Sequence, residues 1–232
     1  MTTCTTTAGG NGPEIPRSHS ARFDDDYPTR LRRARLGMLV AATPILMLFI
    51  SFTSAYVVRQ GLPTFDSRTN TMVRDWVPIR LPPILIFNTC LLLLSTATME
   101  VARRQVKREI AFPADGYLSR NAPRKDAGLL WLSLTTLLGL CFLAGQWRAW
   151  QELEAAGFYV ATSPSSSFFY LLTGAHALHL TGGILVLVFA CVARILRRPV
   201  ESSGVLVDVS AWYWHLMAGL WLYIWCLLTF AH

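Results

Sequence analysis

Two stretches near the C-terminus decide the fold: FFYLLTGAHALHLTGGILVLVFACVARIL over residues 168–196 and SAWYWHLMAGLWLYIWCLLTF over residues 210–230. Each is long and apolar enough to cross the hydrocarbon core of a bilayer, which takes about 20 residues of helix. Three histidines, His176, His179 and His215, lie inside these stretches. Polar side chains are costly in hydrocarbon and therefore indicate a structural or functional purpose. We therefore expect this protein to act within a membrane.

The composition of the chain also indicates a membrane protein. Of the 232 residues, 53% are hydrophobic and only 15% are charged, whereas soluble domains carry about 25% charged residues. The formal net charge is +7, but the basic residues cluster beside the apolar stretches. There they indicate topology and contact with anionic lipid, and no nucleic-acid partner is expected.

Five apolar segments of spanning length predict an all-α integral membrane protein with a bundle of five transmembrane helices. They cover residues 35–57, 81–102, 127–149, 167–193 and 210–231. Residues 1–34 are polar and rich in Thr, Gly, Pro, Asp and Arg. We expect them to form a cytoplasmic tail that is disordered or bound to a partner, ahead of a five-helix domain over residues 35–232. The tail lacks the charged start and apolar core of a signal peptide.

Lysine and arginine residues near the ends of the spans predict the orientation. The sequence TRLRRAR precedes the first span, ARRQVKRE and RNAPRK follow the second, and RILRRP follows the fourth. An alternating path places these clusters on one side of the membrane, while acidic residues dilute the basic ones on the other. The positive-inside rule then predicts a cytoplasmic N-terminus and a C-terminus outside.

The histidines allow two interpretations. His176 and His179 are three residues apart and share one helix face, and His179 and His215 reach nearly the same depth from opposite sides, at about 1.5 Å per residue. One interpretation is ligation of haem or a metal by facing helices, although no carboxylate lies within reach to orient such ligands. The other, which we favour, is that neutral imidazoles form hydrogen bonds with neighbouring helices or ordered water.

Acidic residues are nearly absent from the spans. Glu100 lies at the end of the second span and Asp208 just before the fifth. Proton-moving membrane proteins commonly carry buried acids along the proton path, so a self-contained pump is not expected. The connections hold no nucleotide loop or catalytic triad motif and are too short for a catalytic domain. We therefore predict no catalytic, cofactor-binding or metal-binding residue in this chain.

The same stretches resemble a known family, subunit III of the haem-copper oxidases, which comprise the cytochrome c and quinol oxidases. The family's TG-x-H-x-x-H signature is matched over residues 173–179, and its AWYWH-x-x-x-x-x-W ending over residues 211–221. LGMLVAATPILMLF, LPPILIFNTCLLLLS and FLAGQWRAW are similar to the three preceding core helices, with Gln146 at the landmark glutamine. The resemblance covers nearly all of the chain after the tail. It implies a five-span form without the two extra N-terminal spans of the seven-helix form.

The chain departs from the family pattern at several positions that hold acids or histidines in other members. These positions are Pro44 and Ile45 for a Ser-Glu pair, Ala149 for a glutamate, Ala218 for an aspartate, and Arg103 and Arg104 for two histidines. The acid before AWYWH is retained as Asp208. The chain thus resembles a divergent member, and roles that depend on a buried acid are not expected of it.

The resemblance implies an accessory, cofactor-free subunit of a respiratory oxidase that reduces dioxygen to water. Haem and copper would belong to the partner catalytic subunit I, and the helices would hold phospholipid in a cleft. The expected location is the bacterial inner (plasma) membrane, as a multi-pass protein. Two alternatives remain: a subunit-III-like partner of nitric oxide reductase, and a haem-bearing, quinol-oxidising membrane anchor with His179 and His215 as ligands.

The candidate site residues form two sets. The polar side chains expected between helices are His176, His179, His215, Asn88, Gln146, Thr173 and Asp208. The residues expected to anchor the protein at lipid or at the membrane interface are Trp212, Tyr213, Trp214, Arg103, Arg104, Arg197 and Arg198.

Overall fold

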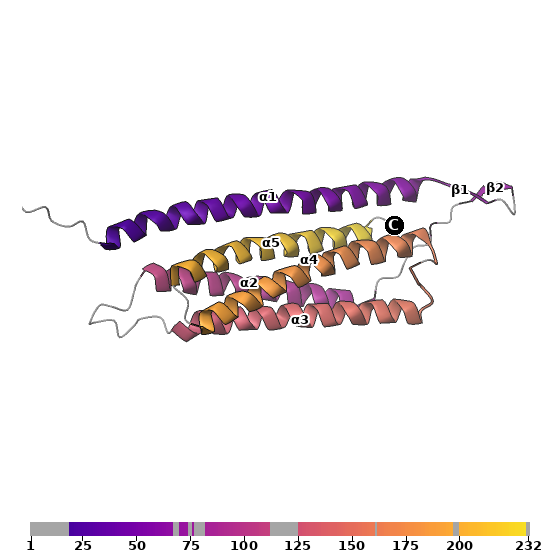
Figure 1. Cartoon of the computed structure of the whole chain (residues 1–232). Coiled ribbons are helices and arrows are strands. Elements are labelled where there is room, and N and C mark those ends of the chain that lie inside the picture. The colour runs from indigo at the N-terminus through magenta and orange to yellow at the C-terminus, as the bar shows by residue number, and fades with distance from the viewer. Residues whose placement is uncertain are drawn as a thin grey trace, which may run out of the picture.

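The computed structural model describes residues 19–66, 70–73, 76, 82–111, 125–160, 162–196 and 200–230. In these residues the chain forms five long helices (Figure 1). They are α1 (His19–Gly61), α2 (Ile84–Ala111), α3 (Lys125–Ala155), α4 (Pro164–Ile195) and α5 (Val200–Phe230). Each contains a stretch long and apolar enough to cross a membrane, which confirms the predicted five-helix fold.

Two features differ from the prediction. Two short antiparallel strands, β1 (Thr64–Asp66) and β2 (Thr71–Val73), follow α1, and the all-α prediction missed them. Helix α1 begins at His19, so residues 19–34 of the expected tail are helical, while residues 1–18 lie outside the described part. Arginine, leucine and alanine have high helix propensity, and the segment RLRRARL continues directly into the span.

The start of α4 shows how local sequence sets a helix boundary. The Ser163 side chain accepts a hydrogen bond from the backbone N–H of Ser166, and the Ser166 side chain accepts one from the backbone N–H of Ser163. This capping box satisfies donors that a helix N-terminus leaves free. Pro164 occupies the first helical position, where its missing N–H costs no hydrogen bond.

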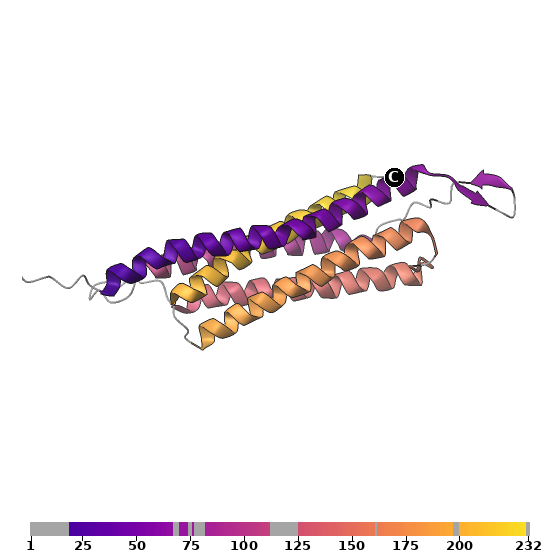
Figure 2. The ribbon, with the colours of Figure 1, turned by 45° about the horizontal axis from the view of Figure 1, so that its top comes forward.

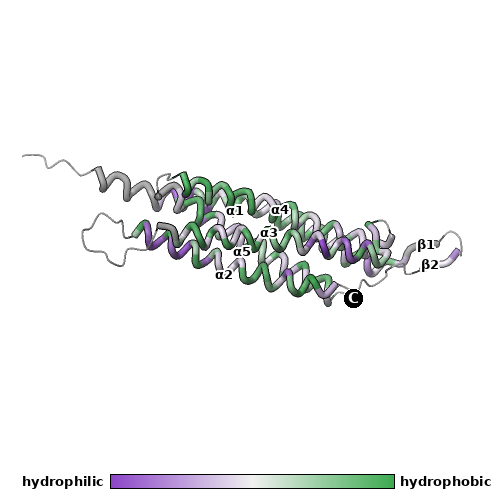
Figure 3. The backbone as a smooth tube through the Cα atoms, turned by 90° about the horizontal axis from the view of Figure 1, so that it is seen from below, coloured by the Kyte–Doolittle hydropathy of each residue, from purple (hydrophilic) through white to green (hydrophobic). Residues whose placement is uncertain are grey.

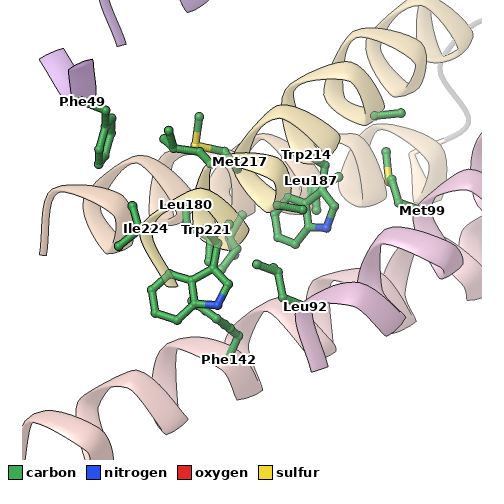
Figure 4. Close-up of a cluster of buried hydrophobic side chains, with 14 of the residues drawn as sticks. Phe49, Leu92, Met99, Phe142, Leu180, Leu187, Trp214, Met217, Trp221 and Ile224 are labelled. Atoms are coloured by element: carbon green, nitrogen blue, oxygen red, sulfur yellow. The ribbon is translucent and has the colours of Figure 1, made fainter. Parts of the chain in front are cut away.

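Helices α2 to α5 pack together, and α1 lies along one side of them, beside α4 and α5 (Figures 1 and 2). The interior of the bundle is filled by large buried side chains from all four helices, and Phe49 of α1 is also buried (Figure 4). The largest fully buried side chains include Trp214, Trp221, Phe142, Phe169, Leu92 and Leu187. Because both tryptophans belong to α5, this helix contributes the two largest side chains of the core.

Glycines allow the helices to approach each other closely. A Cβ atom added at Gly139 of α3 would lie 2.7 Å from the Trp214 ring, and one added at Gly183 of α4 would lie 2.9 Å from the Tyr213 ring. Small residues at such positions are typical of helix packing in membranes, where association depends on close contact.

Hydrophobic residues predominate along the middle of the helices, and hydrophilic residues are more frequent toward their ends (Figure 3). Large apolar side chains are exposed on every helix, among them Val40, Phe87, Leu137, Leu178 and Phe230. An exposed apolar surface of this extent is unfavourable in water and suits a lipid environment. The five apolar helices therefore indicate a multi-pass membrane protein.

Candidate functional site

Asp208 is the centre of a group of ion pairs that joins three helices. Its side chain is only 2% exposed. The Arg35 Nε of α1 donates to Oδ2 at 2.8 Å, and the Arg103 Nε of α2 donates to Oδ1 at 2.8 Å. The Lys107 Nζ lies 3.2 Å from Oδ1. A buried carboxylate requires such partners, because an unpaired charge away from water is very costly.

Glu100, one turn before Arg103 and Arg104, extends this group along α2. Its oxygens accept hydrogen bonds from Arg103 Nη1 at 3.2 Å and from Arg104 Nε at 2.9 Å. The His215 Nε2 of α5 lies 3.6 Å from the Glu100 Oε2, beyond hydrogen-bond distance. We call Arg35, Glu100, Arg103, Arg104, Lys107 and Asp208 the charged cluster.

A separate buried ion pair lies near the same end of the helices. The Arg194 Nη2 of α4 donates to the Glu109 Oε2 of α2 at 2.6 Å, and both side chains are largely buried. Gly128 of α3 makes room for the pair, since a Cβ atom there would lie 3.1 Å from Arg194 and Glu109. Ionic contacts at this end therefore involve α1, α2, α4 and α5.

The three histidines face different neighbours. His176 is fully buried, with its ring centre 5.1 Å from that of Trp221 and 5.9 Å from that of Phe142. His179 packs against Phe49 of α1, with ring centres 5.9 Å apart, and its Nδ1 lies 2.7 Å from the Ala175 carbonyl oxygen of its own helix.

Within the described residues, no side-chain hydrogen bond joins His176 or His179 to a neighbouring helix, and hydrogen bonding of these imidazoles to ordered water stays a prediction. Neither nitrogen of His176 has a hydrogen-bond partner among the described residues. The Nδ1 of His179 bonds within α4 because the carbonyl four residues earlier lies on the same face and within reach of the ring.

His179 and His215 do not face each other, and their expected similar depth stays a prediction. His179 faces α1, whereas His215 approaches Glu100 of α2. Within the described ranges, no three His, Cys, Asp or Glu side chains come close enough together to hold a metal ion.

The three consecutive aromatic residues of α5, Trp212 to Trp214, face different surroundings. Trp212 is half exposed, and the Arg103 guanidinium lies 5.9 Å from its ring centre. The Tyr213 hydroxyl donates to the His179 carbonyl oxygen at 2.9 Å. Trp214 is 1% exposed and its Nε1 donates to the Ser95 Oγ at 3.0 Å. The expectation of a lipid anchor is therefore wrong for Trp214, because successive helix residues point about 100° apart and this one faces the bundle.

The arginines predicted as anchors also differ in how exposed their side chains are. The Arg103 side chain is only 18% exposed and belongs to the ion pairs around Asp208, so it is not a lipid anchor. The Arg104 side chain is 70% exposed although it bonds to Glu100. Arg197 and Arg198 lie outside the described residues.

Asn88, Gln146 and Thr173 are buried in the bundle, as their place on apolar helices suggests. The Thr173 Oγ1 accepts a hydrogen bond from the Trp150 Nε1 at 3.1 Å and donates to the Phe169 carbonyl oxygen at 2.7 Å. For the side chains of Asn88 and Gln146, the described structure shows no hydrogen-bond partner.

Hydroxyl groups on α2 form bonds between helices that the sequence interpretation did not include. The Trp221 Nε1 donates to the Thr89 Oγ1 at 3.0 Å, and the Oγ1 atoms of Thr98 and Thr135 lie 2.9 Å apart. A signal was present: Trp214 and Trp221 are seven residues apart and so share a helix face, and Thr89, Ser95 and Thr98 interrupt an otherwise apolar span. These groups hold helices together and include no evident reacting centre.

Comparison with known proteins gives a family match over most of the chain. The family model described as cytochrome c oxidase subunit III matches residues 23–231. A cytochrome c oxidase subunit 3 from Xenopus laevis is 30% identical over 195 residues, which cover 82% of this chain and 66% of the frog protein. A probable cytochrome c oxidase subunit 3 from Mycobacterium tuberculosis (strain H37Rv) is 31% identical over 100 residues, 43% of this chain and 49% of that protein. The matched regions thus span 49–66% of the length of these relatives.

Proposed function

Because this chain belongs to the cytochrome c oxidase subunit III family, we propose that it is an accessory subunit of a respiratory haem-copper oxidase. The family match over residues 23–231 carries the proposal. The chain would pack against the catalytic subunit I, which would hold the haem and copper and reduce dioxygen to water. It would itself hold no cofactor and catalyse no step.

The arrangement of polar side chains supports an accessory role. The charged cluster, the Glu109 and Arg194 pair, and the bonds from Trp214 and Trp221 to hydroxyls all join helices of this chain to each other. His179 and His215 face different helices, which disfavours the alternative in which they hold one haem between them. These groups stabilise the packing of the helices within this chain.

We also propose contacts with phospholipid and a position in the bacterial inner membrane. Arg104 and Trp212 are exposed beside the charged cluster, where a cation and an indole suit the headgroup region. The lipid chains would lie along the apolar outer faces of the helices, including α1. The positive-inside rule favours a cytoplasmic location for the end that carries the charged cluster and the N-terminus.

Purification of the intact complex tests this proposal. We expect mass spectrometry to identify a haem-copper catalytic subunit together with this chain, and the separated chain to show no Soret absorption. A Soret band that stays with the isolated chain would favour the quinol-oxidising anchor. A partner that reduces nitric oxide instead of dioxygen would favour the nitric oxide reductase alternative.

Histidine variants provide a second test on the assembled complex. We expect His179→Ala and His215→Ala to loosen subunit association only slightly, because the Nδ1 of His179 bonds within α4 and His215 lies 3.6 Å from the Glu100 Oε2; even a direct polar contact between membrane helices contributes only about 0.6 kcal/mol on average. The haem content per catalytic subunit should stay unchanged in quantitative haem spectroscopy. Loss of haem in both variants, with the catalytic subunit still present, would show that these residues are ligands.

A further inference from the structure

Three polar side chains in the bundle interior are buried and have no hydrogen-bond partner within the described part of the chain. They are Asn88 of α2, Gln146 of α3 and His176 of α4, and both polar atoms of each are affected. Their exposed fractions are 0%, 1% and 0%. Buried polar atoms in proteins nearly always have a partner, which is often ordered water, and hydrocarbon offers none from outside.

Asn88 of α2 lies against the backbone of α3 one residue before Gln146. The Asn88 amide rests on Gly145, where an added Cβ atom would lie only 2.0 Å from the Asn88 Oδ1. Gly145 directly precedes Gln146. The absence of a side chain at position 145 therefore places the Asn88 amide at the same level of α3 as Gln146.

Gln146 and His176 lie at the same level of α3 and α4. Phe142 packs on His176, and Trp150 bonds to Thr173, so these two helices run antiparallel, and the segment between Phe142 and Trp150 lies beside the turn from Thr173 to His176. Gln146 is four residues from both Phe142 and Trp150 and shares their helix face. It therefore faces the turn of α4 between Thr173 and His176.

Trp221 of α5 packs against His176 and Phe142 here but does not supply the missing hydrogen bonds. Its ring centre lies 5.1 Å from that of His176 and 5.0 Å from that of Phe142. The close-up shows Trp221 next to Phe142 (Figure 4). Its only donor, Nε1, is used by the Thr89 Oγ1. The two amides and the imidazole must therefore find another partner.

We propose that Asn88, Gln146 and His176 line an internal water-binding site at the centre of the four-helix bundle. An amide both donates and accepts hydrogen bonds, and a neutral imidazole has one donor and one acceptor. Water can match both kinds of group, and a buried water molecule typically makes about three hydrogen bonds. The three side chains carry no carboxylate or thiolate that would favour a metal cation instead.

Radiolytic labelling of the intact complex in ¹⁸O-water tests the site, because hydroxyl radicals formed from a bound water oxidise the side chains next to it. Trp221 is the reporter and Trp214 the matched control: both are 1% exposed, both donate to a hydroxyl of α2, and they are seven residues apart on α5. We expect severalfold more oxidation of Trp221 than of Trp214. Equal, low oxidation of the two would overturn the proposal.

The variant Gln146→Met replaces one polar side chain of the proposed site by an apolar side chain of nearly the same volume. We expect the oxidation of Trp221 to fall toward the level of Trp214, and that of Trp214 to stay unchanged. Unchanged oxidation of Trp221 in this variant would contradict the proposal.

Should the variant fail to assemble, a high-resolution structure of the unaltered complex tests the water site instead. Density within about 3 Å of both a His176 nitrogen and an amide would support the site, whereas amides of Asn88 and Gln146 bonded directly to each other, without such density, would overturn it.

Discussion

Helix α1 is at least as apolar as each helix of the bundle of α2 to α5, yet it is held very differently. Only 11% of the apolar stretch of α1 is buried inside the molecule, against 33–39% for the other four helices. The contacts that attach α1 to α4 and α5 include Arg35 with Asp208, Phe49 with His179, and Tyr56 with Phe168. The bundle instead contains buried aromatic rings, glycine contacts and hydrogen bonds between helices.

The difference shows what holds helices together in lipid. Apolar surface alone gives little preference for a neighbouring helix over lipid chains, so association depends on close packing and polar links. Gly37 of α1 would admit a Cβ atom with nothing within 4 Å. The hydroxyls of Thr43, Ser51 and Thr53 bond to the backbone of α1 itself. Glycines and hydroxyls link helices in the bundle, whereas these four residues of α1 make no such link to another helix, so we expect α1 to detach first.

The largest effect should come from Asp208→Asn, which acts on both regions. The change leaves Arg35, Arg103 and Lys107 without their shared carboxylate, and loss of one partner of a buried ion pair costs about 3 kcal/mol. We expect a clear fall in the midpoint of thermal unfolding of the complex and increased protease sensitivity of α1. Glu100→Gln is the control, since that side chain is 30% exposed. An equal effect of the two variants would contradict the central role of Asp208.

Gly139→Ala should damage the bundle and leave the attachment of α1 intact. Its Cβ atom would meet the buried Trp214 ring at 2.7 Å, and overpacking of this kind costs about 1–3 kcal/mol. Thermal unfolding measures the effect. The control is Gly182→Ala, where nothing lies within 4 Å of the new atom and helix propensity favours alanine by about 1 kcal/mol. A Gly139→Ala variant as stable as Gly182→Ala would show that α3 and α5 are loosely packed.

Phe49→Ala should separate α1 from α4 while the bundle keeps its stability. Phe49 is 1% exposed and packs on His179. We expect a loss of about 1–2 kcal/mol in α1 docking, less than in an aqueous core because lipid can replace part of the contact. Distances between spin labels on α1 and α4 would become longer and broader. Ile50→Ala, at an exposed neighbouring position, should leave them unchanged. Broadening in both variants would mean that α1 is attached by its whole surface.

The smallest effect should come from Arg104→Ala, which changes stability by less than about 0.5 kcal/mol, because an ion pair with a 70% exposed partner is heavily screened. Arg103→Ala should be distinctly worse, since that side chain is 18% exposed and bonds to both Asp208 and Glu100. Thermal unfolding of the two variants side by side measures the difference. Equal effects would place Asp208 and Glu100 in equally solvated positions.

Sequence by itself determined the five helices and the family. Both signals are local: a spanning length is set by the thickness of the hydrocarbon core, and the TG-x-H-x-x-H and AWYWH signatures are contiguous. It also identified Asp208, Asn88, Gln146 and Thr173 as buried polar residues, because such side chains are conspicuous in apolar helices. Helix ends were less predictable, since α1 continues through residues assigned to the tail.

Only the tertiary structure decided which way each side chain faces. Trp212 and Trp214 are two residues apart, yet one is half exposed and the other buried, and Arg103 and Arg104 differ in the same way. In a soluble protein, alternating polar and apolar residues would mark the inward face of a helix. Here lipid and protein interior are both apolar, so that pattern is absent. The inward face is set instead by glycine contacts, hydroxyl partners and the shared carboxylate of Asp208, which join residues far apart in sequence.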